Sequence, residues 1–120
     1  MSFSALAAAV MMGQASFSLV IDVPPPDRVD VAYPEILRGD NQAAMEKLYE
    51  KRLASREDPA VLINLGTVYK RLGYVAHSQE AFRAALTSSD RYQLELASGE
   101  WMDSRDIARL ALRGEQIALR

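Results

Sequence analysis

The sequence predicts a mainly α-helical protein built from antiparallel helical hairpins, with a small β-hairpin and a capping helix after them. Residues 58–89 carry two apolar stripes at three- and four-residue spacing, separated by Gly73, which is typical of two amphipathic helices. Gly39 stands 34 residues before Gly73, which indicates that the hairpin occurs twice. Residues 92–102 alternate apolar and polar side chains around a Ser-Gly turn, which predicts the β-hairpin.

Composition narrows the classes of function. The 120 residues, 49% hydrophobic and 25% charged, fit one globular unit. Acidic residues number 16 and basic residues 14, so the basic excess of a nucleic-acid-binding surface is absent and no nucleic acid is expected as a partner. With no cysteine and a single histidine, His77, the chain lacks the usual ligands for zinc or haem, and we expect neither a metal nor a cofactor.

The first 27 residues are divided into two predicted segments, residues 1–15 and residues 16–27. An apolar run at 5–12 followed by Gly13 and Ala15 predicts a signal peptide over residues 1–15, hence export to a bacterial periplasm; the run is too short to cross a membrane. No Lys or Arg precedes the run, so the alternative is a cytoplasmic chain in which it packs into the fold. Residues 16–27 are expected to be extended: 17–23 alternate like a strand, and three consecutive prolines at 24–26 exclude helix.

Residues 28–90 are expected to hold the helical repeats. In the first copy, residues 40–55 predict a helix, with apolar side chains at Ala44, Met45, Leu48, Tyr49 and Leu53. A partner helix is expected over 28–38, where Pro34 should kink or shorten it. In the second copy, Asp58 is an N-cap followed by Pro59 at the first helical position, and Gly73 ends this helix. A further helix follows at 75–88.

Within the second copy, Asn64-Leu65-Gly66, Tyr69 and Gly73 are followed by Phe82, Ala85 and Leu86. This pattern resembles the tetratricopeptide repeat, in which Leu-Gly and a Tyr three residues later mark the first helix and an aromatic residue followed by Ala marks the second. The resemblance implies that Gly66 lets the two helices approach closely. Leu62 and Ser78 depart from the family's usual Trp and Ala, and Asp90 replaces the closing proline, which indicates that the array stops there.

Residues 91–120 predict a β-hairpin and a capping helix. Tyr92, Leu94 and Leu96 alternate with polar residues, Ser98-Gly99 forms the turn, and residues 100–102 return as a second strand. Asp103 or Ser104 should cap a helix whose inner face holds Ile107, Leu110, Ala111 and Ile117, unless Gly114 ends it first. We expect Trp101 to anchor this unit over the end of the helical stack, and residues 17–23 to pair with the first strand.

The sequence contains no recognisable catalytic constellation, so a non-enzymatic role is expected. Ser104 has no histidine near it in the sequence and is better explained as part of a helix cap. His77 is expected to face solvent near the start of its helix. The glycines are dispersed, so the chain has no glycine-rich phosphate-binding loop.

Binding to another polypeptide remains as the expected function. In the family that the repeat resembles, the first helix of each pair lines a peptide-binding groove, which implies that Ile63, Asn64, Thr67, Lys70 and Arg71 face such a groove. The two basic residues could hold an acidic peptide, or they could simply complement the dipole at the end of their helix. The alternative function is structural: self-association, for example as a homodimer, through uncovered repeat faces.

Overall fold

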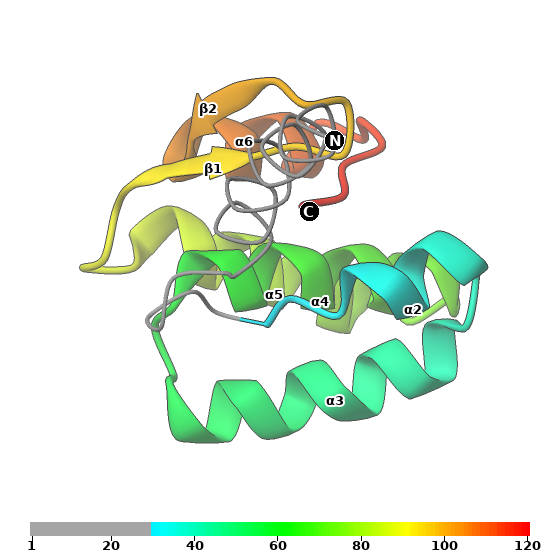
Figure 1. The fold of residues 1–120 in the computed structure, drawn as a ribbon. Helices are drawn as coiled ribbons and strands as arrows, with labels where there is room; N and C mark the ends of the chain where they lie inside the picture. The colour runs from blue at the N-terminus through cyan, green and yellow to red at the C-terminus, as the bar shows by residue number, and fades with distance from the viewer. Residues whose placement is uncertain (1–29) are drawn as a thin grey trace, which may run out of the picture.

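The computed structural model describes residues 30–120, which form five helices and one two-stranded antiparallel sheet (Figure 1). In chain order these are α2 (Tyr33–Arg38), α3 (Asn41–Ala54), α4 (Pro59–Arg71), α5 (Val75–Thr87), β1 (Gln93–Glu95), β2 (Trp101–Asp103) and α6 (Ser104–Leu112). The prediction of a mainly helical chain with a small β-hairpin is confirmed. The predicted signal peptide at 1–15, the strand at 17–23 with its pairing, and the three prolines lie outside the described residues.

The helix boundaries follow from capping residues that the sequence makes visible. The Asp58 carboxylate accepts a hydrogen bond from the Ala60 amide (3.0 Å), and Asp103 accepts one from the Arg105 amide (2.8 Å). Each carboxylate therefore satisfies one of the free amides at a helix start. At the other end of α4, Gly73 has φ +88°, the left-handed conformation that glycine adopts with little strain.

Helix α2 is shorter than the predicted range 28–38. It begins at Tyr33, and Pro34 lies in its first turn, where a missing amide hydrogen leaves no helical bond unmade. Before it, Ala32 has φ 58°, and its amide donates to the Asp30 carboxylate at 2.9 Å. The proline therefore sets the start of the helix, as its position predicted.

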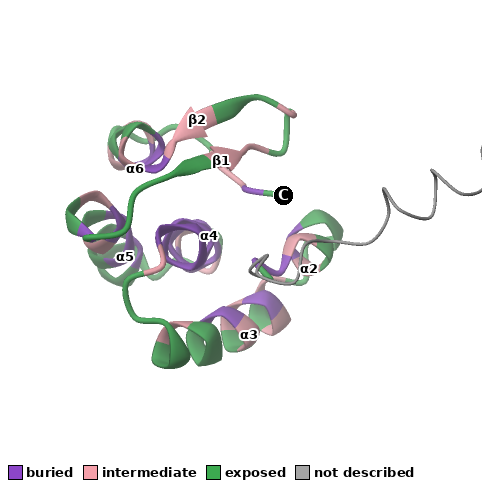
Figure 2. Ribbon diagram, turned by 60° about the vertical axis from the view of Figure 1, so that its left-hand side comes forward, coloured by how far each residue is buried: buried purple, intermediate pink, exposed green. Residues whose placement is uncertain are grey.

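Helix α4 is the centre of the molecule. Every residue from Pro59 to Tyr69 is buried, and Figure 2 shows α4 surrounded by α3, α5, α2 and the hairpin unit. An amphipathic surface helix would bury one stripe only, whereas a helix that is covered on all sides must be apolar around its circumference. Asn64 and Thr67 are the polar side chains in this buried stretch, so their hydrogen bonds require an explanation.

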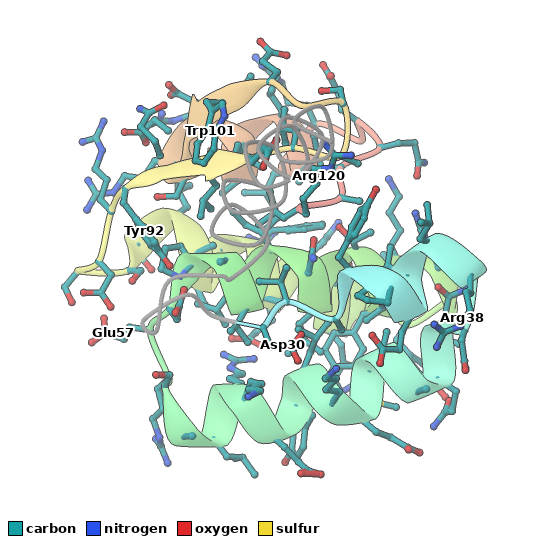
Figure 3. The ribbon with its side chains drawn as sticks, in the orientation of Figure 1. Asp30, Arg38, Glu57, Tyr92, Trp101 and Arg120 are labelled. Atoms are coloured by element: carbon teal, nitrogen blue, oxygen red, sulfur yellow. The ribbon has the colours of Figure 1, made fainter. Side chains whose placement is uncertain are left out.

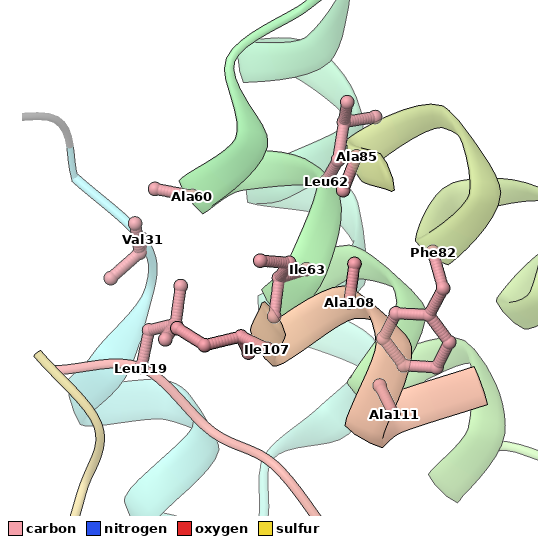
Figure 4. Packing of buried hydrophobic residues seen from close by; sticks show 10 residues of the cluster. All are labelled: Val31, Ala60, Leu62, Ile63, Phe82, Ala85, Ile107, Ala108, Ala111 and Leu119. Atoms are coloured by element: carbon pink, nitrogen blue, oxygen red, sulfur yellow. The ribbon is translucent and has the colours of Figure 1, made fainter. Parts of the chain in front are cut away.

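Buried side chains form two clusters on opposite sides of α4. One cluster joins α4 to α5 and α6, and Figure 4 shows it around Ile63, Phe82 and Ile107. The other joins α4 to α2 and α3 through residues that include Leu48 and Leu65. Between α4 and α5, a Cβ atom added to Gly66 would lie 2.5 Å from the Phe82 ring. The two helices therefore approach each other as closely as a glycine permits.

The expectation that Trp101 anchors the hairpin unit was wrong, because 61% of its surface is exposed. Successive residues of a strand face opposite sides of a sheet. Trp101 pairs with Glu95 on the outer side, whereas the next pair, Leu94 and Met102, packs inward against the core. Of the residues expected on the inner face of α6, Ile107 and Ala111 are buried, and Ile107 is the fully buried large side chain there.

Candidate binding site on helix α4

The five predicted groove residues lie along one side of α4, which we call the α4 face (Ile63, Asn64, Thr67, Lys70 and Arg71). This side is not open. Residues 115–120, which we call the return segment, run between the hairpin and α4 (Figure 1). The first three residues of the α4 face are consequently buried, Lys70 is half-buried, and Arg71 is exposed.

Asn64 makes the most specific contact with the return segment. Its Oδ1 accepts from the backbone amide of Leu119 (2.8 Å), and its Nδ2 donates to the backbone carbonyl of the same residue (3.1 Å). Nδ2 also donates to the carbonyl of Val31 at 2.9 Å. Both amide hydrogens and the carbonyl oxygen are thus paired in a fully buried position. The Asn64 side chain therefore forms hydrogen bonds with both backbone groups of a residue 55 positions later in the sequence.

Two further contacts continue this line along α4. The Thr67 hydroxyl donates to the Ile117 carbonyl (2.6 Å), and the Lys70 ammonium donates to the Gly114 carbonyl (3.2 Å). As the residue number rises along α4, the number of the contacted residue falls from 119 to 114. The chain from Gly114 to Leu119 therefore runs antiparallel to α4, and residues on successive turns of the helix bind its backbone groups.

The other edge of the return segment pairs with the hairpin. Leu119 forms an isolated antiparallel bridge with Leu96. The Ala97 amide donates to the Ala118 carbonyl (2.8 Å), and the Arg120 amide donates to the Glu95 carbonyl (3.1 Å). Backbone groups of successive residues in an extended chain point to opposite sides. Residues 118 and 120 are therefore held by the hairpin, whereas residue 119 is held by Asn64.

Side chains of the return segment complete the fit. Leu119 is 1% exposed and lies in the core with Val31, Ile63 and Ile107 (Figure 4). Ile117 is half-buried against the same cluster, and Ala118 packs against the cluster between α2, α3 and α4. Within the return segment, residues 117–120 thus have backbone groups bound on alternate sides, and their aliphatic side chains are packed against the core.

The sequence did not reveal this segment. Ile117 was expected on the inner face of the last helix unless Gly114 ended that helix first, and the second case is observed: α6 ends at Leu112 and Gly114 has φ +98°. A left-handed glycine reverses the chain direction after a helix, and the chain then returns across α4. The available signals were Gly114 and the Ile-Ala-Leu run that follows it, together with Asn64 in an otherwise apolar stripe.

The two basic residues of the α4 face are already engaged within the chain. Lys70 holds the Gly114 carbonyl, and Arg71 donates from Nη1 to the Ile36 carbonyl at 3.2 Å. Both lie in the last turn of α4, where a cation also complements the helix dipole. In this arrangement they join α4 to the neighbouring segments.

Ion pairs hold the outer elements together. Lys47 bridges the carboxylates of Asp30 (2.9 Å) and Glu35 (3.2 Å). Burial raises the pKa of Asp30, but hydrogen bonds from Lys47 and a backbone amide outweigh it and lower that pKa below the ordinary 3.8. Its own backbone amide, and then Lys47, lower the pKa of Glu35 below 4.5. The three residues therefore hold α3 against α2 and the segment before it.

A second set of contacts fixes the start of the hairpin. Tyr92 donates a hydrogen bond to the Asp58 carboxylate that caps α4, and it lies at the same end of the molecule as Glu57 (Figure 3). Burial, followed by that hydrogen bond, raises the pKa of Tyr92 far above its ordinary value. The Glu57 backbone carbonyl accepts from the Ser88 hydroxyl, which joins the end of α5 to the start of α4.

Ser104 and His77, the two residues considered as catalytic candidates, make contacts that are typical of structural roles. Ser104 is buried at the start of α6, where its hydroxyl accepts from the Tyr92 amide (3.4 Å) and Asp103 provides the cap. His77 is exposed on α5, as predicted, and its ring contacts the rings of Tyr69 and Tyr74 with centroid separations of 5.2 and 6.0 Å. These contacts give neither side chain a hydrogen-bonded nucleophile–base pair.

Two features are absent from residues 30–120. In that part of the chain no helix has both the length and the apolar character needed to cross a membrane. Nowhere in the same range do three or more His, Cys, Asp or Glu residues gather in a way that could hold a metal ion. Comparison with protein-family models, curated proteins and solved structures finds no match for this chain.

Proposed function

We propose that this protein is a non-enzymatic interaction module of tetratricopeptide type, which binds an extended segment of a partner polypeptide along the α4 face. The observation that carries the proposal is the pairing of the Asn64 side chain with both backbone groups of Leu119. Contacts to the main chain provide affinity for any extended peptide, and adjacent apolar positions provide selectivity. We further propose that the module is exported to a bacterial periplasm.

The geometry of the helical pairs supports the repeat interpretation. Gly39 follows α2 with φ +78°, and Gly73 follows α4 with φ +88°, so the equivalent positions of two copies share a left-handed conformation. With the same 34-residue shift, Leu48 in α3 corresponds to Phe82 in α5, and both are buried. Ser78, which replaces the family's usual Ala, donates to the Gly66 carbonyl at 2.8 Å and so is accommodated at the helix contact.

The proposal is tested by photo-crosslinking in cells. A benzophenone amino acid placed at Lys70, beside the return segment, should crosslink to a partner protein, and mass spectrometry should locate the contact in an extended stretch of that partner. The matched control carries the same group at Arg83, an exposed residue of α5. Equal products from both positions, or products from Arg83 alone, would contradict binding at the α4 face.

Self-association is a second candidate, favoured by large apolar side chains on the outer surface. Tyr49 and Leu53 on α3 are 49% and 58% exposed, and Tyr74 and Val75 at the start of α5 are 50% and 58% exposed. Such residues are candidates for contact with a second copy. Sedimentation velocity should then show a concentration-dependent dimer that Leu53→Glu weakens. A monomer at all accessible concentrations would exclude this candidate.

A further inference from the structure

We infer that the return segment occupies the site at which a partner binds. A partner segment with a similar side-chain pattern would displace it from the α4 face. This inference rests on the proposed function and specifies its ligand and its regulation. The expected ligand is an extended peptide with the pattern aliphatic, small, aliphatic and basic, as in residues 117–120. The bound state of the module would then require displacement of its own segment.

The binding geometry is that of strand addition. The return segment adds to the hairpin edge at residues 95–97, and its opposite side is bound by Asn64 and Thr67. All these contacts go to backbone atoms of the segment, which every extended peptide carries. An incoming peptide in the same register can therefore reproduce the hydrogen bonds one for one.

Selectivity arises at two side-chain positions. Leu119 is enclosed by aliphatic side chains of α4, α6 and the segment before α2, so a charged residue there would be buried without a partner. At the next position Arg120 lies near an acidic group and an aromatic ring: Glu95 at 3.5 Å and the Tyr33 ring centroid at 5.8 Å. These neighbours favour a basic residue after the buried aliphatic one.

The segment is connected so that it can leave without unfolding α6. Residues 113 and 114 join the end of the helix to the return segment, and they are exposed together with the first two residues of that segment. Leu119 is the one fully buried side chain in the segment. Because the connection to α6 is short, the segment competes with a free peptide at a high effective concentration, of the order of millimolar. The apparent affinity for a free peptide is therefore the intrinsic affinity multiplied by the fraction of molecules in which the segment has left.

Because the chain contains no cysteine, a single engineered disulfide can hold the return segment in place reversibly. Leu96 and Leu119 form an antiparallel pair whose flanking residues carry the backbone hydrogen bonds, and in such pairs the Cα atoms lie about 4.5 Å apart, within disulfide range. A full-length Leu96→Cys, Leu119→Cys variant would hold the segment when oxidised. When reduced, it would hold the segment weakly, because cysteine fills less of the space that Leu119 occupies.

The probe is a fluorescein-labelled peptide with the sequence of residues 114–120 (GEQIALR), and binding is measured by fluorescence anisotropy. The inference predicts that reduction of the disulfide tightens binding of the probe at least about tenfold. Asn64→Leu in the reduced background should abolish this binding, and a probe with Asp in place of Leu should not bind. Near-UV circular dichroism checks the fold of each form, and full-length Leu119→Ala is used if the reduced double variant unfolds.

The outcomes separate the inference from the proposed function. Measurable binding of equal strength in both redox states would overturn displacement while leaving peptide binding intact. If hydrogen exchange shows that the residue 119 amide is released and the probe still does not bind, both displacement and peptide binding would be overturned. An unoccupied α4 face would then have failed to bind an extended peptide. A residue 119 amide that stays protected after reduction would overturn the inference, since the segment would not be detachable.

Discussion

Replacement of Gly66 by alanine tests the close contact between α4 and α5. A Cβ atom at this position would lie 2.5, 2.7 and 2.9 Å from three atoms of the Phe82 ring, which is itself buried. Overpacking of this kind costs about 1–3 kcal/mol. The higher helix propensity of alanine offsets about 1 kcal/mol of that cost. With three contacts this short the cost lies in the upper part of its range, so we expect a net loss of about 1–2 kcal/mol.

The assay is urea unfolding followed by circular dichroism at the helical band, with Gly66→Ala compared in the wild-type and Phe82→Leu backgrounds. Removal of the ring should make Gly66→Ala neutral or stabilising, which would give a coupling energy above about 0.5 kcal/mol. Gly73→Ala is the contrasting variant: its Cβ meets nothing within 4 Å, and its loss of about 1 kcal/mol should arise from the positive φ alone and persist in both backgrounds. If Gly66→Ala were as stable as the wild type, the steric argument would be refuted.

Three further predictions concern the buried amide, the ion pairs and the exposed indole. Asn64→Leu should reduce the free energy of unfolding by about 2–4 kcal/mol in urea titrations, because it leaves three backbone groups without partners. Since the pKa values of Asp30 and Glu35 are lowered below 3.8 and 4.5, respectively, their contribution is complete above about pH 5 and is lost as the pH falls through these lowered pKa values. Acid titrations of Lys47→Met should therefore show a shallower loss of stability than the wild type, and parallel curves would argue against the ion pairs. Trp101→Ala should change stability by less than about 0.5 kcal/mol in thermal melts, because the side chain is exposed, and a larger loss would restore its role as an anchor.

Local signals predicted most of the secondary structure. Asp58 and Asp103 cap helices in the structure as they do in the sequence pattern, and Gly73 ends α4. These features depend on neighbours within a few residues, so their consequences can be derived without knowledge of the fold. Pro34 belongs to the same group, because its effect on the start of α2 follows from its own ring.

The candidate site was predicted only in part, because its character depends on contacts that are distant in the sequence. Ile63, Asn64 and Thr67 were expected to face a peptide-binding groove, and in the structure they are buried on the side of α4 that the return segment covers. Nothing local indicates that Leu119, 55 residues after Asn64, returns to cover them. The exposure of Trp101 was missed for a similar reason, since the strand alternation gives two faces and only the packing of α6 decides which face is inner.

The most direct test of the account follows the Leu119 amide and the Asn64 side-chain amide by NMR in isotope-labelled, full-length protein as the unlabelled GEQIALR peptide is added. If the peptide displaces the return segment, the Leu119 amide loses its protection from hydrogen exchange at saturating peptide. The Asn64 side-chain protons should remain hydrogen-bonded and show new contacts to the leucine of the peptide. A Leu119 amide that stays protected, with resonance changes confined to Tyr49 and Tyr74, would contradict binding at the α4 face and place the interaction on the outer surface of α3 and α5.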